Sequence, residues 1–406
     1  MSTQASAGRR GKDVRSDCWV QLTTATEGGI TMTCQSKVEV LYGRSIRELV
    51  TRVLQHFGVQ HMQVHVEDAG ALPYVIAART EAALRRLQPG TSGGFLLDAR
   101  TRLAERTPRD RFRRSRLYLP GNDPKLAINA GLHQPDAVIL DLEDSVAPME
   151  KDAARVLVRN TLRAVDFMGA ERMVRINQLP LGVTDLEMIV PELPHLVLVP
   201  KVESAEQIRE VNDVIARVQQ QTGSHTIHLM PIIESALGAI RAFEIATAAD
   251  NVVALAIGLE DYTADIGAER TLEGRESQWM RGAVVNAARA AGVQAIDTVF
   301  SDVSDMDGLF ASAQEARALG FDGKGCIHPR QIAVVHRAFA PGERELDRAK
   351  KIVLAFDEAQ RLGLGVVALG SKMIDPPVVK RAQHTIDLAL RAGMLVPNWK
   401  EEVSHA

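Results

Sequence analysis

Charged side chains that could do chemistry follow an apolar run of strand length in the second half of this sequence. Val252 to Ile257 form the run, which ends at Gly258, and the carboxylates Glu260 and Asp261 follow at once. A strand buried on both faces reads as a continuous apolar run, and acids at its carboxyl end lie where α/β enzymes hold their chemistry. An aspartate that caps a following helix explains one such loop equally well. The interpretation therefore depends on whether other strands end in the same way.

Other apolar runs do end in the same way. The charged residues at these expected strand ends are Glu143, Asp144, Arg175, Lys201, Glu203, Glu234, Glu260 and Asp261. If the strands close into a barrel, their ends converge on one mouth, where gathered charges are costly unless they bind something. The sequence therefore predicts a charged binding site at that mouth.

Short apolar runs that alternate with helical stretches must position these residues. The runs lie at residues 117–119, 137–140, 173–174, 196–199, 228–233, 252–257, 295–296 and 323–327. Eight such βα units are the number in a (β/α)8 TIM barrel of typical length. A doubly wound open sheet usually has fewer strands and a Gly-rich first turn, and the sequence contains no GxGxxG. We therefore expect an α/β chain with a TIM barrel at residues 116–340.

A smaller α+β domain is expected in front of the barrel. Residues 1–17 are small, polar and charged and are expected to form a disordered tail. Residues 18–88 follow the order ββαβα, and Glu27-Gly28-Gly29 separates two alternating runs that predict a β-hairpin. Residues 89–115 are expected to be a linker that closes with the basic run from Arg109 to Arg116. That run reads either as solvated linker or as a patch that attracts the phosphates of a nucleotide-bearing thioester.

A helical arm is expected at the C-terminal end, over residues 341–406. Two amphipathic helical stretches there flank the segment Lys372-Met373-Ile374-Asp375-Pro376-Pro377. Pro376 and Pro377 prevent helix at this point and hold Asp375 in an extended turn. Asp375 is therefore either a functional acid or a helix-initiating aspartate before a proline at the first helical position.

The composition argues against several classes of protein. The 406 residues carry a net charge of −3 with nearly balanced acids and bases, which gives no footprint for nucleic acid or an anionic membrane. No apolar run approaches the roughly 20 residues of a spanning helix, and the first residues lack the apolar core of a secretory signal. The cysteines Cys18, Cys34 and Cys326 form no CxxC, which fits a reducing cytoplasm.

The front domain resembles the acyl carrier protein (γ) subunit of citrate lyase over residues 16–88. The resemblance is carried by Ser36-Lys37-Val38-Glu39, Val66-Glu67-Asp68-Ala69-Gly70-Ala71-Leu72 and Ala78-Arg79-Thr80-Glu81-Ala82. In that family a serine near the N-terminus carries a phosphoribosyl-dephospho-coenzyme A arm. Ser16 stands in the corresponding place, although the family's Glu is missing and the Ser-Asp spacing is one residue short. A plain serine at the edge of a tail is the alternative.

The barrel and the arm resemble citrate lyase β subunits, within the wider HpcH/HpaI aldolase and citrate lyase family. The resemblance covers residues 114 to about 395 and is carried by Leu117-Tyr118-Leu119-Pro120-Gly121-Asn122, Leu140-Asp141-Leu142-Glu143-Asp144, Val174-Arg175-Ile176-Asn177, Pro200-Lys201-Val202-Glu203-Ser204, Ile233-Glu234-Ser235, Gly258-Leu259-Glu260-Asp261-Tyr262 and Lys372-Met373-Ile374-Asp375. It implies a TIM barrel that uses Mg²⁺ and assembles as homotrimers or hexamers.

The resemblance also implies roles for individual residues. Glu234 and Asp261 correspond to the family's metal ligands, and Arg175 corresponds to its substrate arginine. Glu143 and Asp144 correspond to its Glu-Asp pair close to the metal-bound waters. These five residues, together with Asp375 as a further catalytic acid, are the expected catalytic centre.

Further contacts are implied around this centre. Asp375 corresponds to an aspartate that reaches into the site of a neighbouring subunit. The family often has an arginine where Leu237 stands here, and this departure is expected to change what is recognised near the metal. The candidate contacts for the substrate or for coenzyme A are Arg175, Pro120, Asn122, Lys201 and Glu260.

These residues favour an Mg²⁺-dependent carbon–carbon lyase of the citryl-thioester type, with a carrier-like domain fused in front. A 3-hydroxyacyl thioester with a carboxylate beside its hydroxyl can chelate the metal, and loss of the hydroxyl proton then yields a 2-oxo acid and an acyl thioester. One alternative is a malyl-CoA or citramalyl-CoA lyase or thioesterase that acts on free CoA thioesters. A second is a non-catalytic carrier or assembly subunit, against which the complete charged set argues.

Overall fold

The chain folds into two units, Met1–Ile332 and Ala333–Ala406, which are described separately. The computed structural model describes residues 3–99, 105–223, 225–363, 367–369 and 372–400. No helix within these ranges has the length and apolar character needed to cross a membrane.

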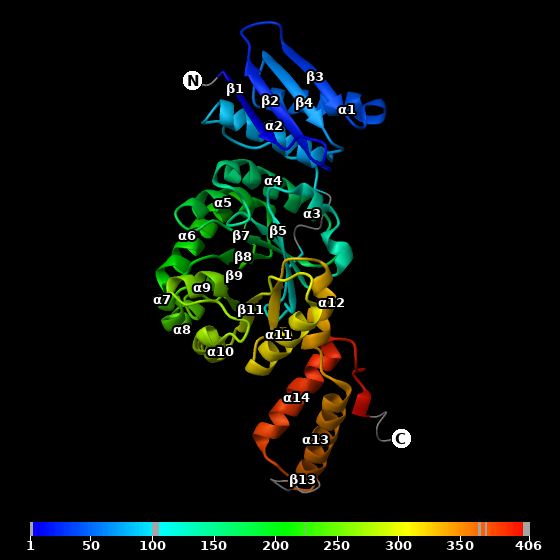
Figure 1. Ribbon diagram of the computed structural model, residues 1–406, viewed down its shortest axis with the longest axis vertical. Coiled ribbons are helices and arrows are strands. Elements are labelled where there is room, and N and C mark those ends of the chain that lie inside the picture. Colours follow the sequence, from blue (N-terminus) through cyan, green and yellow to red (C-terminus); the bar gives the residue numbers. More distant parts are fainter. Residues whose placement is uncertain (1–2, 100–104, 224, 364–366, 370–371, 401–406) are drawn as a thin grey trace. The chain divides into compact units, whose positions relative to one another are not determined.

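A closed barrel of parallel strands forms the larger part of the first unit (Figure 1). Its strands are β5 (Ser115–Pro120), β6 (Ala137–Asp141), β7 (Glu171–Arg175), β8 (Leu196–Val199), β9 (His228–Ile233), β10 (Ala254–Ile257), β11 (Gln294–Val299) and β12 (Gly323–Cys326). Each strand pairs in parallel with its neighbours in sequence, and β12 pairs with β5 to close the ring. The expected TIM barrel is confirmed.

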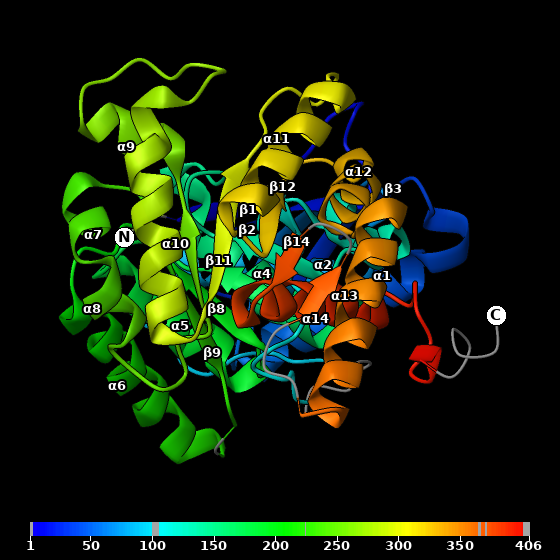
Figure 2. The same ribbon diagram turned by 90° about the horizontal axis from the view of Figure 1, so that it is seen from below.

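Helices follow the strands and surround the barrel. They are α3 (Pro124–Ile128), α4 (Lys151–Ala164), α5 (Leu181–Ile189), α6 (Ala205–Thr222), α7 (Ala236–Ile240), α8 (Ala242–Ala246), α9 (Leu259–Asp265), α10 (Gln278–Ala291) and α11 (Met306–Leu319). The next helix, α12 (Arg330–Phe339), begins in the first unit and continues into the second. On the outside of the barrel α8 and α10 lie side by side (Figures 1 and 2). Side chains near a helix terminus help to define where the helix begins. At the start of α6, for example, Ser204 and Gln207 form a capping box.

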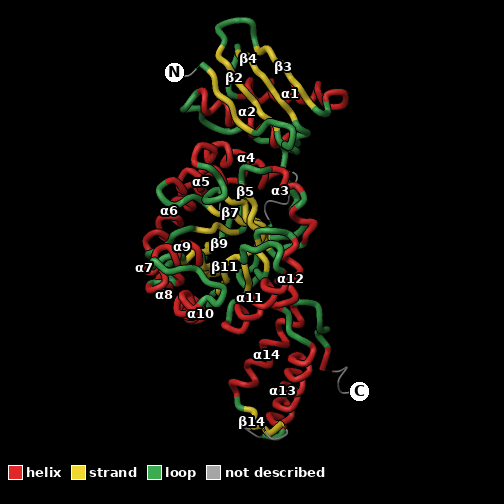
Figure 3. The backbone as a smooth tube through the Cα atoms, in the orientation of Figure 1, coloured by secondary structure: helices red, strands yellow, loops and turns green. Residues whose placement is uncertain are grey.

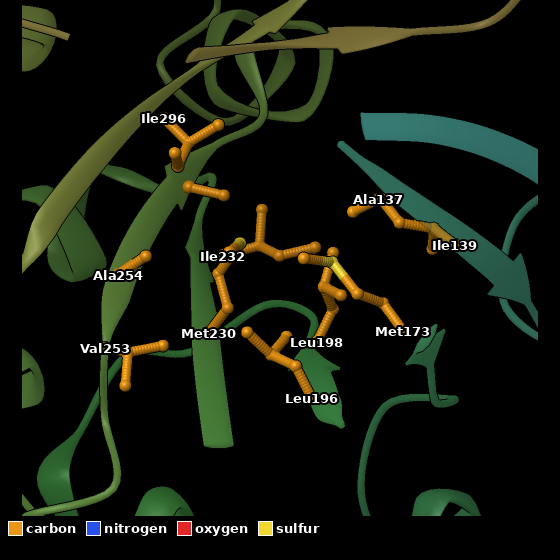
Figure 4. Packing of buried hydrophobic residues seen from close by; sticks show 11 residues of the cluster. Ala137, Ile139, Met173, Leu196, Leu198, Met230, Ile232, Val253, Ala254 and Ile296 are labelled. Carbon is orange, nitrogen blue, oxygen red and sulfur yellow. The ribbon is translucent and has the colours of Figure 1, made fainter. Parts of the chain in front are cut away.

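Alternate residues of the strands fill the inside of the barrel, as Figure 4 shows. Residues two apart on one strand point to the same face, and β6 to β11 contribute apolar side chains to the interior in this way. The buried cluster consists of Ala137, Ile139, Met173, Leu196, Leu198, Met230, Ile232, Val253, Ala254, Ala256 and Ile296. This packed layer lies below the charged strand ends and gives them a rigid base.

The front domain is a four-stranded sheet with two helices packed on one of its faces (Figure 3). Its elements are β1 (Gln4–Gly8), β2 (Cys18–Thr24), β3 (Ile30–Ser36), α1 (Glu39–His56), β4 (Met62–Asp68) and α2 (Pro73–Leu87). The strand order is β1-β2-β4-β3, with β3 parallel to β4 and the other pairs antiparallel. The expected α+β class of this domain is therefore present, with one more strand than expected.

Two expectations for the front domain were wrong. Residues 1–17 do not form a disordered tail over their length, because β1 pairs with β2 from Gln4 to Gly8. The expected hairpin of β2 and β3 is absent, because β4 lies between them and pairs with both. Alternation of apolar residues indicates which face of a strand is buried, but it does not select the neighbouring strand.

The basic run before β5 is also different from both expectations. Arg113 is fully buried and forms a bidentate ion pair with Glu171, with both N···O distances 2.8 Å. Arg114 pairs with Asp136 at 2.9 Å. Both acids lie at the amino ends of strands, opposite the mouth. Arg113 and Arg114 therefore belong neither to a solvated linker nor to a phosphate patch at the mouth, and they anchor the amino ends of β6 and β7.

The second unit contains a helical hairpin. Its elements are α13 (Glu343–Arg361), the paired short strands β13 (Val367–Leu369) and β14 (Lys372–Ile374), and α14 (Pro376–Arg391). Apolar residues of α13 and α14 pack together, with Trp399 in the same cluster. Asp375 is exposed and caps α14, since its carboxylate accepts a hydrogen bond from the Val378 N–H at 3.1 Å. The helix-initiating interpretation of Asp375 is confirmed, and this cap leaves the functional interpretation open.

Candidate active site

The most connected cation at the mouth is Arg175, the last residue of β7. Its guanidinium donates two hydrogen bonds to Asp141, from Nε at 2.6 Å and from Nη2 at 2.7 Å. It also lies over the ring of Tyr118, with 5.4 Å between Cζ and the ring centroid. Burial opposes ionisation of Asp141, but the bonds from Arg175 hold the pKa of that carboxyl below its usual range. The two hydrogen bonds to Asp141 therefore hold the guanidinium group of Arg175 in one orientation.

The third guanidinium nitrogen of Arg175, Nη1, lies close to two further acids. Its Nη1 lies 2.7 Å from Oε2 of Glu143, at ion-pair distance without an aligned hydrogen bond, and 3.3 Å from Oδ2 of Asp144. Burial and the nearby Asp144 carboxylate raise the pKa of Glu143 to about 7, against the opposing effect of Arg175. A carboxyl with that pKa exchanges a proton readily near neutral pH, as a general acid or base must.

A second group of acids surrounds the ends of β9 and β10. Glu234 follows β9 and is only 5% exposed, and its Oε1 accepts a hydrogen bond from the Lys201 N–H at 2.7 Å. Its Oε2 faces Gly258, where any Cβ would collide with it. Burial, followed by the charge of Asp261, raises the pKa of Glu234 to about 8. Glycine at position 258 is therefore required to admit this carboxylate.

Lys201 joins the two groups of acids. Its Nζ lies 3.6 Å from Oδ1 of Asp261 and 3.7 Å from Oε1 of Glu143. Arg175, Glu143, Lys201 and Asp261 therefore form one chain of ion pairs across the mouth, from β7 to α9. The expected convergence of these strand ends is present in the structure.

The acids around Glu234 fit a divalent cation. Glu234 is a buried carboxylate that forms no ion pair with a described residue, and it lies close enough to Asp261 for the two charges to repel. Among the described residues no three His, Cys, Asp or Glu side chains form a metal-binding group. Two carboxylate ligands with open positions for water and substrate suit Mg²⁺, which keeps several waters.

Not every residue expected at the site faces this chain of ion pairs. The Glu260 side chain is 66% exposed and pairs with Arg270 at 2.9 Å, so it does not join Arg175 and Lys201. Asn122 is buried, and its backbone and side-chain oxygens accept hydrogen bonds from the front domain. Asp375 lies in the second unit, at the start of α14.

Asp141 and Tyr118 are site residues that the sequence reasoning did not select. Asp141 is buried and receives both hydrogen bonds of the Arg175 fork. Its position as the first charged residue after Val138-Ile139-Leu140 was a usable signal, because it shares its strand end with Glu143. Tyr118 gave no such signal, since an aromatic residue within an apolar strand reads as core.

Matches to known families agree with this fold and this site. Residues 114–329 match the HpcH/HpaI aldolase/citrate lyase family. Because the match covers more than half of the chain, the protein belongs to the HpcH/HpaI aldolase/citrate lyase family. Residues 4–87 match the acyl carrier protein family described as malonate decarboxylase delta subunit (MdcD). The match begins at β1, so the added strand belongs to that domain.

Two individual proteins of this family are similar to most of the chain. Citrate lyase subunit beta of Leuconostoc mesenteroides subsp. cremoris is 40% identical over 284 residues, which are 69% of this chain and 94% of that protein. Mitochondrial citramalyl-CoA lyase of Homo sapiens is 34% identical over 329 residues, which are 75% of this chain and 97% of that protein. Both relatives are lyases by name.

A solved structure shares the fold. The crystal structure of CitE from Mycobacterium tuberculosis, in complex with magnesium, acetoacetate and coenzyme A, matches with a TM-score of 0.57 and 32% identity. The match covers 70% of this chain and 100% of that chain. Its barrel therefore corresponds to the barrel described here, and part of this chain has no counterpart in it.

Proposed function

We propose that the protein is an Mg²⁺-dependent carbon–carbon lyase. Its substrate would be a 3-hydroxy-3-carboxyacyl thioester, cleaved to a 2-oxo acid and an acyl thioester. The observation that supports this proposal most is the clamped guanidinium of Arg175, which lies in one chain of ion pairs with Glu143, Lys201 and Asp261. Cleavage produces a negatively charged enolate oxygen. A hydrogen-bond donor that is already held in place, next to a site for a cation, stabilises that charge as it develops.

Glu234 and Asp261 would hold the metal. Their oxygens are the ligand type that Mg²⁺ prefers. Burial and the charge of Asp261 raise the pKa of Glu234, so a divalent cation held by both carboxylates would favour the ionised form of Glu234. When bound, Mg²⁺ supplies Lewis acidity and a template for the hydroxyl and carboxylate oxygens of the substrate. The other steps are carried by the side chains of this protein.

Glu143 is the proposed acceptor of the substrate hydroxyl proton. Its carboxyl has a pKa of about 7, so a large fraction is unprotonated near neutral pH. When the hydroxyl loses its proton, the bond between C2 and C3 breaks. The C3 carbon becomes the carbonyl of the 2-oxo acid, and the electron pair goes to the thioester enolate.

Arg175 would stabilise the enolate oxygen, and Asp375 would return a proton to the enolate carbon. Because Asp141 holds the guanidinium in place, little reorganisation is needed as charge develops, and one such donor is worth about 10²–10³ in rate. Asp375 would come from a neighbouring subunit of a homotrimer or hexamer. Lys201, Pro120 and Asn122 are proposed to line the binding site for the thioester.

The form of the thioester defines two candidate functions. The acyl carrier family match over residues 4–87 favours a thioester carried on a covalent phosphoribosyl-dephospho-coenzyme A arm at Ser16. The names of two similar proteins, a citramalyl-CoA lyase and a CitE crystallised with coenzyme A, favour free CoA thioesters instead. The lyase chemistry is the same in both cases.

Two measurements test these proposals. The purified enzyme should cleave at least one of citryl-CoA, malyl-CoA and citramalyl-CoA in the presence of Mg²⁺, and Arg175→Lys should lower kcat by about 10²–10³ because lysine lacks the two-pronged donor. An unchanged kcat in Arg175→Lys would remove this residue from the mechanism. Intact-mass analysis of protein from its native host then separates the two thioester forms, since only a carrier shows the mass of the arm at Ser16.

A further inference from the structure

The second helix of the front domain is buried on all sides. Every residue of α2 from Tyr74 to Leu84 is buried, and so is every residue of the barrel helix α4 from Ala153 to Leu162. A helix on the surface of a free-standing domain normally keeps one polar face in water. These two helices instead pack against each other, α2 lying along α4 (Figure 1). Each therefore covers the face that the other would expose.

Charged side chains within this contact are paired across the two domains. Arg159 of α4 donates to both carboxylate oxygens of Glu81 on α2, at 2.9 Å and 2.7 Å. Glu81 also accepts the Phe95 N–H at 3.0 Å. Burial opposes ionisation of Glu81, but the hydrogen bonds from Arg159 lower the pKa of its carboxyl below the usual range. The contact between α2 and α4 therefore combines apolar packing with a buried ion pair that fixes how the two helices align along each other.

Arg79 extends the contact to the mouth of the barrel. Its side chain is 1% exposed and donates to both oxygens of Asp17, at 2.9 Å and 2.8 Å. Its Nη2 also donates to the backbone oxygen of Asn122 at 2.8 Å. Asp17 is the neighbour of Ser16, and Asn122 lies in the loop that follows β5. One buried cation therefore joins the turn around Ser16 to the first loop of the mouth.

This loop is in turn tied to the catalytic arginine. The Gly121 N–H donates to the Asp141 backbone oxygen at 2.7 Å, and a Cβ at position 121 would lie 2.6 Å from that oxygen. Asp141 is the residue whose carboxylate clamps Arg175. From the outside, Arg9 holds the same loop through Asn122 at 3.1 Å and Asp123 at 2.8 Å.

We propose that the front domain is a permanently docked part of the active site, and that Arg79 is a positioning residue that holds the first mouth loop through Asn122. The domain then presents the turn around Ser16 to its own barrel from a fixed place, instead of moving between separate enzymes as a free carrier subunit does. Only the kinetic test of this proposal rests on the proposed lyase function of the barrel. The exchange measurements do not depend on it.

Hydrogen–deuterium exchange of the full-length protein tests docking without any assay of activity. Peptides from α2 and α4 should exchange as slowly as those from the barrel strands β8 and β9. In Arg159→Gln, exchange should rise in both helices together while β8 and β9 stay unchanged. Fast exchange along α2 in the unmodified protein would overturn permanent docking.

Arg79→Lys tests the positioning role, with Arg44→Lys on the exposed surface of α1 as the matched control. Exchange in peptides spanning residues 121–129 should rise in Arg79→Lys only, and kcat/KM should fall about tenfold. If this variant does not fold, Arg9→Gln removes exposed contacts to the same loop and should raise the same exchange with a smaller kinetic effect. Unchanged loop exchange and unchanged kcat/KM in the folded variant would overturn the role of Arg79. A wild-type enzyme that cleaves no thioester would contradict the lyase function and leave the exchange results valid.

Discussion

The backbone N–H of Lys201 donates to the buried carboxylate of Glu234, and Lys201 adopts a left-handed backbone conformation to do so, with φ of 51°. For a residue with a Cβ this conformation costs roughly 1–2 kcal/mol, which glycine would avoid. The same residue places its ammonium between Asp261 and Glu143. Lys201 thus orients Glu234, a proposed metal ligand, by its backbone N–H, and its ammonium offsets the charge of Asp261 and Glu143.

The first prediction concerns the side chain of Lys201. Lys201→Gln should bind Mg²⁺ several-fold more tightly than the wild type, because a cation that repels the metal has been removed. At an effective dielectric constant of about 20, a unit charge a few ångströms away is worth a few kcal/mol, and the 35% exposure of this side chain reduces that amount. Isothermal titration calorimetry without substrate measures the affinity, and Lys125→Gln on the exposed surface is the control. Equal affinities would mean that the ammonium does not act on the cation.

The second prediction concerns stability and pH at Glu234. Its folded pKa of about 8 is above the unfolded value of about 4.5, so ionisation destabilises the fold, and the loss of stability grows as pH rises between these values. At full ionisation the loss reaches up to about 5 kcal/mol without metal. In EDTA at pH 8, Glu234→Gln should therefore melt several degrees above the wild type, and at pH 5 the difference should shrink. Thermal melts at both pH values measure this, with Glu260→Gln as an exposed control.

Adding Mg²⁺ should reverse the order of these melting temperatures. The metal binds the folded wild type and raises its Tm, whereas Glu234→Gln has lost a ligand and should gain little. A variant that Mg²⁺ stabilises as strongly as the wild type would remove Glu234 from the metal site.

The third prediction concerns the pH profile of the reaction. If Glu143 accepts the hydroxyl proton, kcat/KM should rise tenfold per pH unit and reach a plateau above about pH 7, because the carboxylate form is required. Bound Mg²⁺ favours that charged form and should move the limb to lower pH. Glu143→Gln should abolish the acid limb along with most of the activity. A limb that survives in this variant belongs to another group.

The fourth prediction concerns Asp375 and subunit exchange. Glu234→Ala and Asp375→Asn should each be inactive alone, but co-expression of the two chains should restore about a quarter of wild-type activity if each site uses Asp375 of a neighbour, by random pairing in a head-to-tail ring. If each site uses its own Asp375, no mixture is active. Native mass spectrometry of the mixture shows whether mixed oligomers formed, which validates a negative result.

The barrel and the charged mouth were predictable from the sequence for a local reason. Each βα unit carries its own signal, an apolar run followed by a charged residue, and parallel strands in a barrel bring all such ends to one face. Arg175, Glu143, Lys201 and Asp261 therefore meet in the structure as expected. The direction of each side chain within the mouth was not predictable, as the pairing of Glu260 with Arg270 shows.

The features that were not predictable depend on partners far away in the sequence. Asp17 and Arg79 are 62 positions apart, and the contact between Arg159 and Glu81 spans 78 positions. On the sequence alone each of these residues reads as an ordinary surface charge. Arg113 was misread for the same reason, because its burial depends on Glu171 at the start of β7. A charged residue is expected to be exposed to solvent, but it can be buried when the fold places an opposite charge beside it.

β1 has a practical consequence for handling the protein. It is one of the two edge strands of the front sheet and pairs with β2 over Gln4–Gly8. A chain shortened to begin at Cys18, where composition suggests that nothing structured is lost, would turn β2 into an open edge with unpaired N–H and C=O groups. Such an edge, with Val20 and Leu22 behind it, is a template for sheet formation between molecules. We therefore expect a chain without residues 4–8 to aggregate more readily, and affinity tags are better placed where they leave these residues free to pair.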